Sequence, residues 1–372
     1  MTLPATMSAV LLTGHGGPEK LEYRTDVPVP QPRADEVLIQ VEAAGINNTD
    51  INTRIGWYSK AVSGDTNSTA SDGTDQADHD DASWSGVPLS FPRIQGGDVY
   101  GKIVAVGADV DAGRIGEPVV VRNLMRHYVD RRPYECWTYG SDCDGGFAQF
   151  AVAPSSESFT VHSDLSPAEL GTISIAFTTA EGMLHRANMG AERVVITGAS
   201  GGVGLAAVEL AKLRGAEVIA VCSASKADAV LAAGADRVID RTADIVVELG
   251  PRSIDVVVDV VGGDGVNTLL TLLRRGGRYA IAGAIGGPLA EIDLRTVYLN
   301  DLSLFGCTFQ EDAVVENIVR YINEGKLKPL VSKTYPLSEI HQAQEDFIAK
   351  KYPGKLVLIP PPVEITADPA DA

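Results

Sequence analysis

The chain of 372 residues lacks any apolar run long enough to span a membrane. Its first residues also lack the basic and apolar regions of a secretory signal peptide. The four cysteines, Cys136, Cys143, Cys222 and Cys307, are too scattered to form a disulfide framework. These absences predict a cytoplasmic enzyme rather than a secreted or membrane-spanning protein.

Positive charge is also scarce. The chain contains 31 lysines and arginines but 49 aspartates and glutamates, which gives a formal net charge of −18. Binding to nucleic acid or to an anionic membrane requires a basic face, so we expect neither as a partner. Arginine outnumbers lysine and aspartate outnumbers glutamate. This bias fits a salt-adapted organism, and it fits an ordinary acidic protein equally well.

Glycine is concentrated in one informative stretch, GASGGVG at residues 198–204. The β-branched run before it predicts a buried strand, and the Ala/Leu-rich run after it predicts a helix. A glycine turn between a strand and a helix lets the backbone approach the pyrophosphate of a dinucleotide at a helix N-terminus. We therefore expect Ser200, Gly201, Gly202 and Val203 to bind pyrophosphate. A tight turn without a ligand is the alternative.

The pattern of apolar residues changes along the chain and predicts an α/β protein of two domains. Strand-like runs predominate up to about residue 152, whereas strands and helices alternate from about residue 166, which predicts a parallel, doubly wound sheet. The expected domains are 1–160, completed by 310–372, and 161–309. Residues 59–86 are rich in Ser, Asp, Thr and Gly and predict a solvated inserted loop, with an active-site lid as the alternative.

Five segments together carry a family resemblance: AGINNTD at 44–50, GGDVYG at 96–101, GGFA at 145–148, the glycine turn, and GKLVL at 354–358. As a set they resemble the medium-chain dehydrogenase/reductase superfamily. The resemblance implies a GroES-like β-rich catalytic domain followed by a Rossmann domain, with the last segment returning to the first domain.

The resemblance also distinguishes between the zinc-dependent and zinc-independent branches of that superfamily. The zinc branch has cysteine, histidine and cysteine ligands at positions that Asn47, Gly97 and Ile175 occupy here. A catalytic zinc needs about three protein ligands, so no metal is expected. The chain is similar instead to zinc-independent quinone oxidoreductases and 2-enoyl thioester reductases.

The same resemblance places catalytic and nicotinamide-binding residues. In residues 45–58 it implies Tyr58 as the group that hydrogen-bonds or protonates the substrate, and Asn47 as the group that orients the substrate or the nicotinamide. A packed aromatic side chain is the alternative for Tyr58. Thr179, Gly283 and Lys355 are expected beside the cofactor.

Several further polar residues are expected to be structural. Asp50 and Asp98 are expected to form hydrogen bonds, and Arg54 to pair with one of them or to face solvent.

The end of the second Rossmann strand indicates which cofactor binds. NAD sites usually carry a carboxylate there, whereas this chain has Ser223, Ser225 and Lys226, and Arg241 follows the third strand. Hydroxyl groups and a cation suit a 2′-phosphate, which predicts NADPH. A polar strand end with a helix cap is the alternative.

Together these features predict an NADPH-dependent oxidoreductase that transfers hydride to a small-molecule quinone or α,β-unsaturated carbonyl or enoyl substrate. The alternatives are an NADP-dependent alcohol dehydrogenase or ketone reductase, and a non-catalytic NADPH-binding protein. The apolar segment 303–309 is a candidate edge strand for a homodimer.

Overall fold

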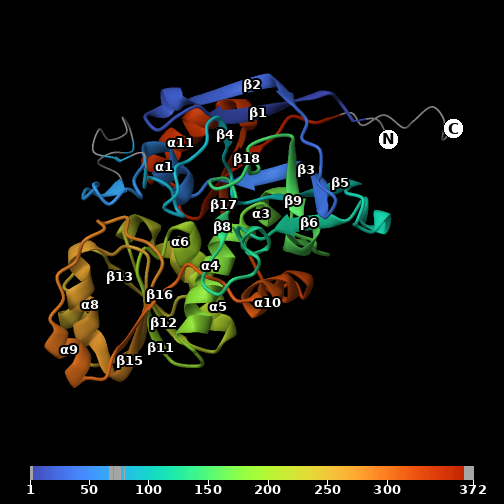
Figure 1. The fold of residues 1–372 in the computed structure, drawn as a ribbon. Coiled ribbons are helices and arrows are strands. Elements are labelled where there is room, and N and C mark those ends of the chain that lie inside the picture. The colour runs from blue at the N-terminus through green and yellow to red at the C-terminus, as the bar shows by residue number, and fades with distance from the viewer. Residues whose placement is uncertain (1–2, 67–69, 71–76, 79, 364–372) are drawn as a thin grey trace.

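The computed structural model describes residues 3–66, 70, 77–78 and 80–363 and shows two halves, each built on its own sheet (Figure 1). In one half, parallel strands run in the order β13-β12-β11-β14-β15-β16. This order is the doubly wound Rossmann arrangement, and it confirms the predicted α/β fold class. The strands are β11 (Arg193–Ile196), β12 (Glu217–Cys222), β13 (Arg237–Asp240), β14 (Ile254–Asp259), β15 (Leu273–Ile281) and β16 (Ser303–Gly306).

Helices cover both faces of this sheet (Figure 1). Neighbouring residues of a strand point to opposite faces, so Val194 packs in the core with α4 and α5, whereas Val195 packs in the core with α8. The helices are α4 (Ile173–Arg186), α5 (Gly202–Leu213), α6 (Ala227–Ala232), α7 (Ile245–Leu249), α8 (Val266–Leu272), α9 (Leu294–Leu299) and α10 (Asp312–Asn323). Helix α8 ends at Leu272, because the chain enters β15 at Leu273.

The other half is β-rich and contains a sheet in the order β10-β6-β5-β3-β18-β17, with β9 also paired to β3. Its strands are β1 (Thr6–Leu12), β2 (Leu21–Pro28), β3 (Glu36–Gly45), β4 (Arg93–Ile94), β5 (Tyr100–Val106), β6 (Pro118–Val121), β7 (Leu124–Met125), β8 (Trp137–Thr138), β9 (Phe150–Pro154), β10 (Ser158–Thr160), β17 (Val331–Pro336) and β18 (Lys355–Ile359). The helices α3 (Pro167–Leu170) and α11 (Ile340–Ile348) pack with these strands, and α1 (Asn48–Ile55) packs with α11.

The end of the chain returns to the β-rich half, as Figure 1 shows where red strands lie beside the blue ones. β18 pairs antiparallel with β3, with Val357 opposite Gly45 and Leu358 opposite Ala44. Residues 354–358 therefore lie beside residues 44–50, although more than 300 positions separate them along the chain. No helix in the described part of the chain is long and apolar enough to cross a membrane.

The inserted loop at 59–86 is less exposed than its composition predicts. Of this segment the structure describes residues 59–66, 70, 77–78 and 80–86. Val62, Ala70 and Ala82 are buried, and Ala70 packs against Ile51 and Ile55 of α1. The prediction of a solvated loop is wrong for these three residues, because a few small apolar side chains suffice to anchor a polar segment on a helix.

The expectation that Arg54 pairs with Asp50 or Asp98 or faces solvent is also wrong. Its side chain is fully buried, and it neither faces solvent nor pairs with Asp50 or Asp98. The guanidinium donates to Gln344 Oε1 at 2.9 Å, to the Gly16 carbonyl at 2.8 Å and to the Ala70 carbonyl at 2.7 Å. Burial lowers the pKa of Arg54 to about 10, so the group stays charged at neutral pH. Arg54 thus joins α1, the inserted loop and α11.

Candidate active site at the junction of the two halves

The glycine turn at 198–204 lies between β11 and α5, where the strand order of the parallel sheet reverses. Gly198 has φ +58°, and a Cβ on it would lie 2.8 Å from Val260 Cγ2. A Cβ on Gly204 would lie 2.6 Å from the Ala199 Cα. Only glycine fits at these two positions. The turn leaves Gly201 exposed at the N-terminus of α5, where backbone N–H groups lack acceptors within the helix.

Residues 350–355, here named the lysine strap, lie directly against this turn. The Gly354 N–H donates to the Ser200 carbonyl at 2.9 Å, and Gly354 forms a β-bridge with Gly201. A Cβ on Gly202 would lie 2.6 Å from Lys355 Cδ, so the aliphatic stem of Lys355 covers this glycine. The strap thereby brings a side chain of the β-rich half onto the Rossmann turn.

The ammonium of Lys355 ends in a buried polar cluster with Asn47 and Asp98. Lys355 Nζ donates to Asn47 Oδ1 at 2.5 Å and to Asp98 Oδ2 at 2.8 Å. The Asn47 amide nitrogen donates to Asp98 Oδ2 at 2.8 Å and to the Gly45 carbonyl at 3.2 Å. Both ends of the Asn47 side chain are therefore engaged inside the protein. As it stands, the amide has no free polar end to orient a substrate or a nicotinamide.

Position 97, where the zinc-dependent branch has a histidine ligand, is closely packed by other groups in this chain. A Cβ on Gly97 would lie 2.7 Å from Ile175 Cδ1 and 2.9 Å from the Tyr139 carbonyl oxygen, and it would also meet the Asn123 amide. A longer side chain at position 97 would displace these groups. Among the described residues, no cluster of three or more His, Cys, Asp or Glu side chains is arranged to hold a metal ion. The residues at this position do not fit a catalytic zinc.

Tyr58 follows α1 and is partly buried. Its hydroxyl donates to Thr49 Oγ1 at 3.0 Å, and its ring meets the Trp84 ring edge-on, with centroids 4.9 Å apart. Burial raises the pKa of the Tyr58 hydroxyl above its usual value, so the group is a protonated donor at neutral pH. Thr49 is a hydroxyl that the sequence prediction did not include.

Thr179 and Gly283 lie on elements that border the same region. Thr179 is on α4, where its neighbour Thr178 accepts a hydrogen bond from Gln310 Nε2 at 2.8 Å. Gly283 follows the carboxyl end of β15, and a Cβ there would lie 2.9 Å from the Val260 carbonyl oxygen. Ligands of doubly wound sheets bind at such carboxyl ends, so the position of Gly283 suits contact with a cofactor.

The predicted 2′-phosphate residues gather at the end of β12. The hydroxyls of Ser223 and Ser225 lie 3.3 Å apart, and Arg241 is hydrogen-bonded through its backbone to Cys222. Lys226 Nζ donates to the Lys350 carbonyl at 2.6 Å. Sequence reasoning missed Lys350, although two consecutive lysines just before Gly354-Lys355 were a visible clue.

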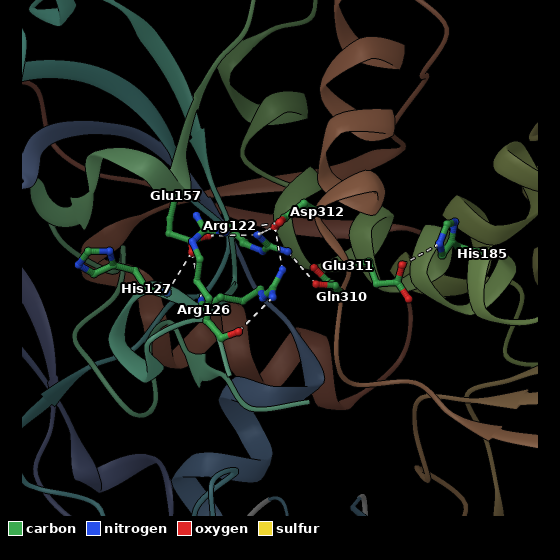
Figure 2. Close-up of polar contacts among 9 residues, drawn as sticks. Arg122, Arg126, His127, Glu157, His185, Gln310, Glu311 and Asp312 are labelled. Atoms are coloured by element: carbon green, nitrogen blue, oxygen red, sulfur yellow. Dashed lines mark hydrogen bonds and ion pairs between the residues drawn. The ribbon is translucent and has the colours of Figure 1, made fainter. Parts of the chain in front are cut away.

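A second polar cluster joins the two halves, as Figure 2 shows. Arg122, buried just after β6, donates to Asp312 Oδ1 at 2.7 Å and to the Gln310 carbonyl at 2.7 Å, and lies 3.4 Å from Glu157 Oε2. Arg126 also reaches Asp312, at 3.0 Å. Although burial opposes it, these guanidinium groups hold the pKa of Asp312 below its usual value. The first residue of α10 is thereby fixed to the β-rich half.

Comparisons with known proteins agree with this geometry. Residues 33–163 match the alcohol dehydrogenase GroES-like domain, and residues 202–324 match the zinc-binding dehydrogenase domain. A quinone oxidoreductase from Lama guanicoe is 30% identical to this chain, over 95% of this chain and 97% of the relative's own length. Acryloyl-coenzyme A reductase from Metallosphaera sedula is 28% identical over 95% of this chain and 99% of its own.

A solved structure is more similar still. A Sinorhizobium meliloti protein whose name assigns it to the alcohol dehydrogenases is 46% identical, with a TM-score of 0.87 over 96% of this chain and 98% of that one.

The buried carboxyl of Asp50 makes the free energy of unfolding depend on pH. Burial raises its pKa from 3.8 to about 7, and its Oδ2 accepts from the Asn47 N–H at 2.7 Å. The folded state therefore retains a proton that the unfolded state loses, and the free energy of unfolding should fall as pH rises from about 4 to about 7. Asp50→Asn keeps an acceptor oxygen and should remove this contribution. Denaturant unfolding at several pH values measures it, with Asp109→Asn at an exposed carboxyl as the control. A wild-type slope in Asp50→Asn would contradict the assignment.

Proposed function

The chain belongs to the medium-chain dehydrogenase/reductase superfamily of oxidoreductases, and on this basis we propose that it is a zinc-independent, NADPH-dependent reductase of quinones or α,β-unsaturated carbonyl compounds. The observation that carries the proposal is the packing at Gly97, where Asn123, Ile175 and the Tyr139 carbonyl lie in the space a metal ligand would need. The relatives named quinone oxidoreductase and acryloyl-coenzyme A reductase support the same substrate classes.

The glycine turn and its surroundings suit a nicotinamide cofactor. When bound, NADPH supplies the hydride. The backbone N–H groups of Gly202 and Val203, at the N-terminus of α5, bind its pyrophosphate, because a helix N-terminus attracts anions. The Gly201 N–H donates to the Gly198 carbonyl at 3.0 Å, so Gly201 contributes by letting the pyrophosphate approach the backbone. Ser200 holds the lysine strap against the turn through its carbonyl. Thr179 and Gly283 contact the nicotinamide half.

The phosphorylated cofactor is favoured by the groups after β12. Ser223 and Ser225 present hydroxyls, and Lys226 and Arg241 present positive charge, whereas β12 ends without the carboxylate that would accept hydrogen bonds from a ribose 2′-hydroxyl. Asp240 on the neighbouring strand is already engaged, because its Oδ2 accepts from the Ala224 N–H at 2.8 Å and its Oδ1 from the Thr242 N–H at 2.9 Å.

The chemistry assigned to this chain is reduction of a conjugated system. Negative charge that develops on an enolate or a hydroquinone oxygen is delocalised, so a hydrogen-bond donor can stabilise it without a metal ion. Tyr58 is that donor, and Thr49 accepts its hydrogen bond in the absence of substrate. Asn47 acts as a positioning residue, because its amide oxygen accepts a hydrogen bond from the ammonium of Lys355, whose aliphatic stem packs on Gly202.

The second candidate function is an alcohol dehydrogenase or ketone reductase, favoured by the name of the 46% identical Sinorhizobium meliloti protein. A simple carbonyl lacks conjugation, so its alkoxide charge is localised and demands stronger stabilisation than an enolate does. The absence of three metal ligands at the family position favours the first candidate over this one.

We also place a second copy of the chain against β16, which is the outer strand of the parallel sheet. Leu304 on this strand and Leu294, Tyr298 and Leu299 on α9 are exposed apolar side chains. An unpaired strand edge beside exposed apolar side chains favours pairing with another chain, which supports a homodimer.

A screen of electron acceptors tests the proposed function. Oxidation of NADPH, followed by its absorbance, should be fast with quinones and enones or enoyl thioesters and slow with simple ketones. Alcohol oxidation and metal analysis of the purified protein run alongside as controls. Rapid alcohol oxidation that is lost on metal removal would favour the second candidate, and NADPH binding without turnover of any acceptor would indicate a non-catalytic protein.

Lys226→Glu should raise the KM for NADPH about tenfold or more, because a hydrogen bond to a charged group contributes about 1.5–3 kcal/mol and the new carboxylate repels phosphate. The KM for NADH should stay the same or fall. Steady-state kinetics with both cofactors measure the change, and Lys226→Met separates loss of attraction from repulsion. An unchanged KM for NADPH would remove Lys226 from the site.

Tyr58→Phe should lower turnover by about 10²-fold or more, the usual range for losing a proton donor, with the Kd for NADPH nearly unchanged. The ring remains to pack against Trp84, so the fold should persist. Tyr23→Phe, on the distant strand β2, serves as the control. Wild-type turnover in Tyr58→Phe would leave the tyrosine as a packed aromatic side chain only.

A further inference from the structure

Two of the three tryptophans in the chain lie beside Tyr58, the proposed donor to the substrate. Aromatic residues make up 6% of the sequence, and its tryptophans are Trp57, Trp84 and Trp137. The ring centroid of Tyr58 lies 4.9 Å from that of Trp84 and 5.8 Å from that of Trp57, and both pairs meet edge-on. A chain with few aromatic side chains therefore groups three of them at the hydroxyl that the proposed reaction uses.

The surroundings of these two tryptophans differ. The indole N–H of Trp57 donates to the Gly64 carbonyl at 3.0 Å, and its ring packs against the apolar cluster of Ile51, Ile55 and Ala70. These contacts give Trp57 a structural role at the start of the inserted loop. Trp84, near the other end of that loop, is partly exposed and meets the Tyr58 ring. Part of its indole is therefore accessible to a ligand beside Tyr58.

The backbone on both sides of Trp84 is fixed. Ala82 and Ser83 are buried, and Ser85 Oγ donates to Asp142 Oδ1 at 2.5 Å. The other carboxylate oxygen of Asp142 accepts from a backbone N–H of β8 at 2.7 Å. A ring that is already held in place loses little conformational freedom when a ligand binds, so this arrangement favours binding on the indole.

A partly exposed indole beside a hydroxyl donor suits a flat, conjugated ring that carries a carbonyl oxygen. Aromatic side chains bind other flat rings with a gain beyond that of the apolar area they bury. A quinone has the required shape, because its ring can pack on the indole while one of its oxygens accepts from the Tyr58 hydroxyl. An acyclic enone can use the hydroxyl but has no ring to pack on Trp84.

The inserted loop also carries negative charge close to Trp84. Asp81 lies three residues before Trp84, and its Oδ2 accepts from the N–H of Lys60, two residues after Tyr58, at 3.0 Å. The described residues of the loop contain one lysine, Lys60, and four aspartates, Asp65, Asp78, Asp80 and Asp81. Like charges brought together disfavour binding, so an uncharged acceptor is favoured over an anionic one such as a coenzyme A thioester.

We propose that Trp84 is a substrate-selecting residue, on which the ring of an uncharged quinone packs while Tyr58 donates to a quinone oxygen. The quinone gains a hydride from NADPH and one proton, which Tyr58 supplies and recovers from water, and leaves as the hydroquinone beside NADP⁺. The inference rests on the proposed reductase function and deepens it by choosing between its substrate classes. Tyr58 acts on every acceptor, whereas Trp84 acts on those with a flat ring.

Steady-state kinetics of Trp84→Leu test the proposal with 1,4-naphthoquinone and with the acyclic enone 3-penten-2-one. Leucine stays apolar but removes the ring, so the KM for the quinone should rise about tenfold while its kcat changes less than about threefold. The KM for the enone and the Kd for NADPH should stay within about twofold of the wild type. Trp84→Phe keeps a smaller ring and should raise the KM for the quinone about two- to threefold. Trp137→Leu, at an exposed tryptophan of β8, is the matched control and should change none of these values.

Substrate preference provides an independent measurement, because the wild type should reduce 1,4-naphthoquinone with a higher kcat/KM than crotonyl-coenzyme A. A preference for crotonyl-coenzyme A would overturn the quinone assignment. Unfolding temperatures show whether the variants fold, and Trp84→Phe carries the test if Trp84→Leu does not. An equal loss with quinone and enone in a folded variant would overturn the selecting role of Trp84. If the wild type reduces no acceptor, the proposed function fails and this inference with it, whereas quinone reduction that both variants leave unchanged would overturn this inference alone.

Discussion

The buried ammonium of Lys355 is the contact on which the rest of the site depends. It lies between Asp98 and Asn47 and 5% of its side chain is exposed, while its stem covers Gly202 in the glycine turn. Breaking a buried ion pair by removing one partner costs about 3–5 kcal/mol, because the other charge is left unpaired. The ion pair therefore stabilises the pairing of β18 with β3. The same pairing places the β-rich half against the glycine turn at 198–204.

This constraint supports the proposal that the site works without a metal. Asp98 holds the first turn of α4 through the Ile175 N–H at 2.6 Å, and it holds Asn47 through the amide. The positions that carry zinc ligands in other members of the superfamily are part of this packed, hydrogen-bonded framework. The protein's own donors near the proposed reaction are then hydroxyl groups, above all that of Tyr58, which suits substrates whose developing charge is delocalised.

Two sets of cations join the halves of an otherwise acidic protein. Arg122 and Arg126 are neutralised by Asp312 and Glu157, so they form a structural connection between β6 and α10. The Lys226 ammonium donates to the Lys350 carbonyl at 2.6 Å, and the Lys350 ammonium lies 4.0 Å from the centroid of the Phe347 ring. The first connection consists of ion pairs, whereas the second consists of contacts with a backbone carbonyl and an aromatic ring.

The sequence by itself determined the strand, glycine turn and helix at 193–213, the α/β fold class and the absence of metal ligands at positions 47, 97 and 175. These depend on local periodicity and on residue type, which are visible without a structure. Tertiary structure alone decided that Arg54 is buried against Gln344, that the Asn47 amide is occupied by Lys355, and that Lys350 lies beside Asn48. In these pairs 290, 308 and 302 positions separate the partners. No local pattern encodes such contacts, because they arise only when the end of the chain pairs with β3.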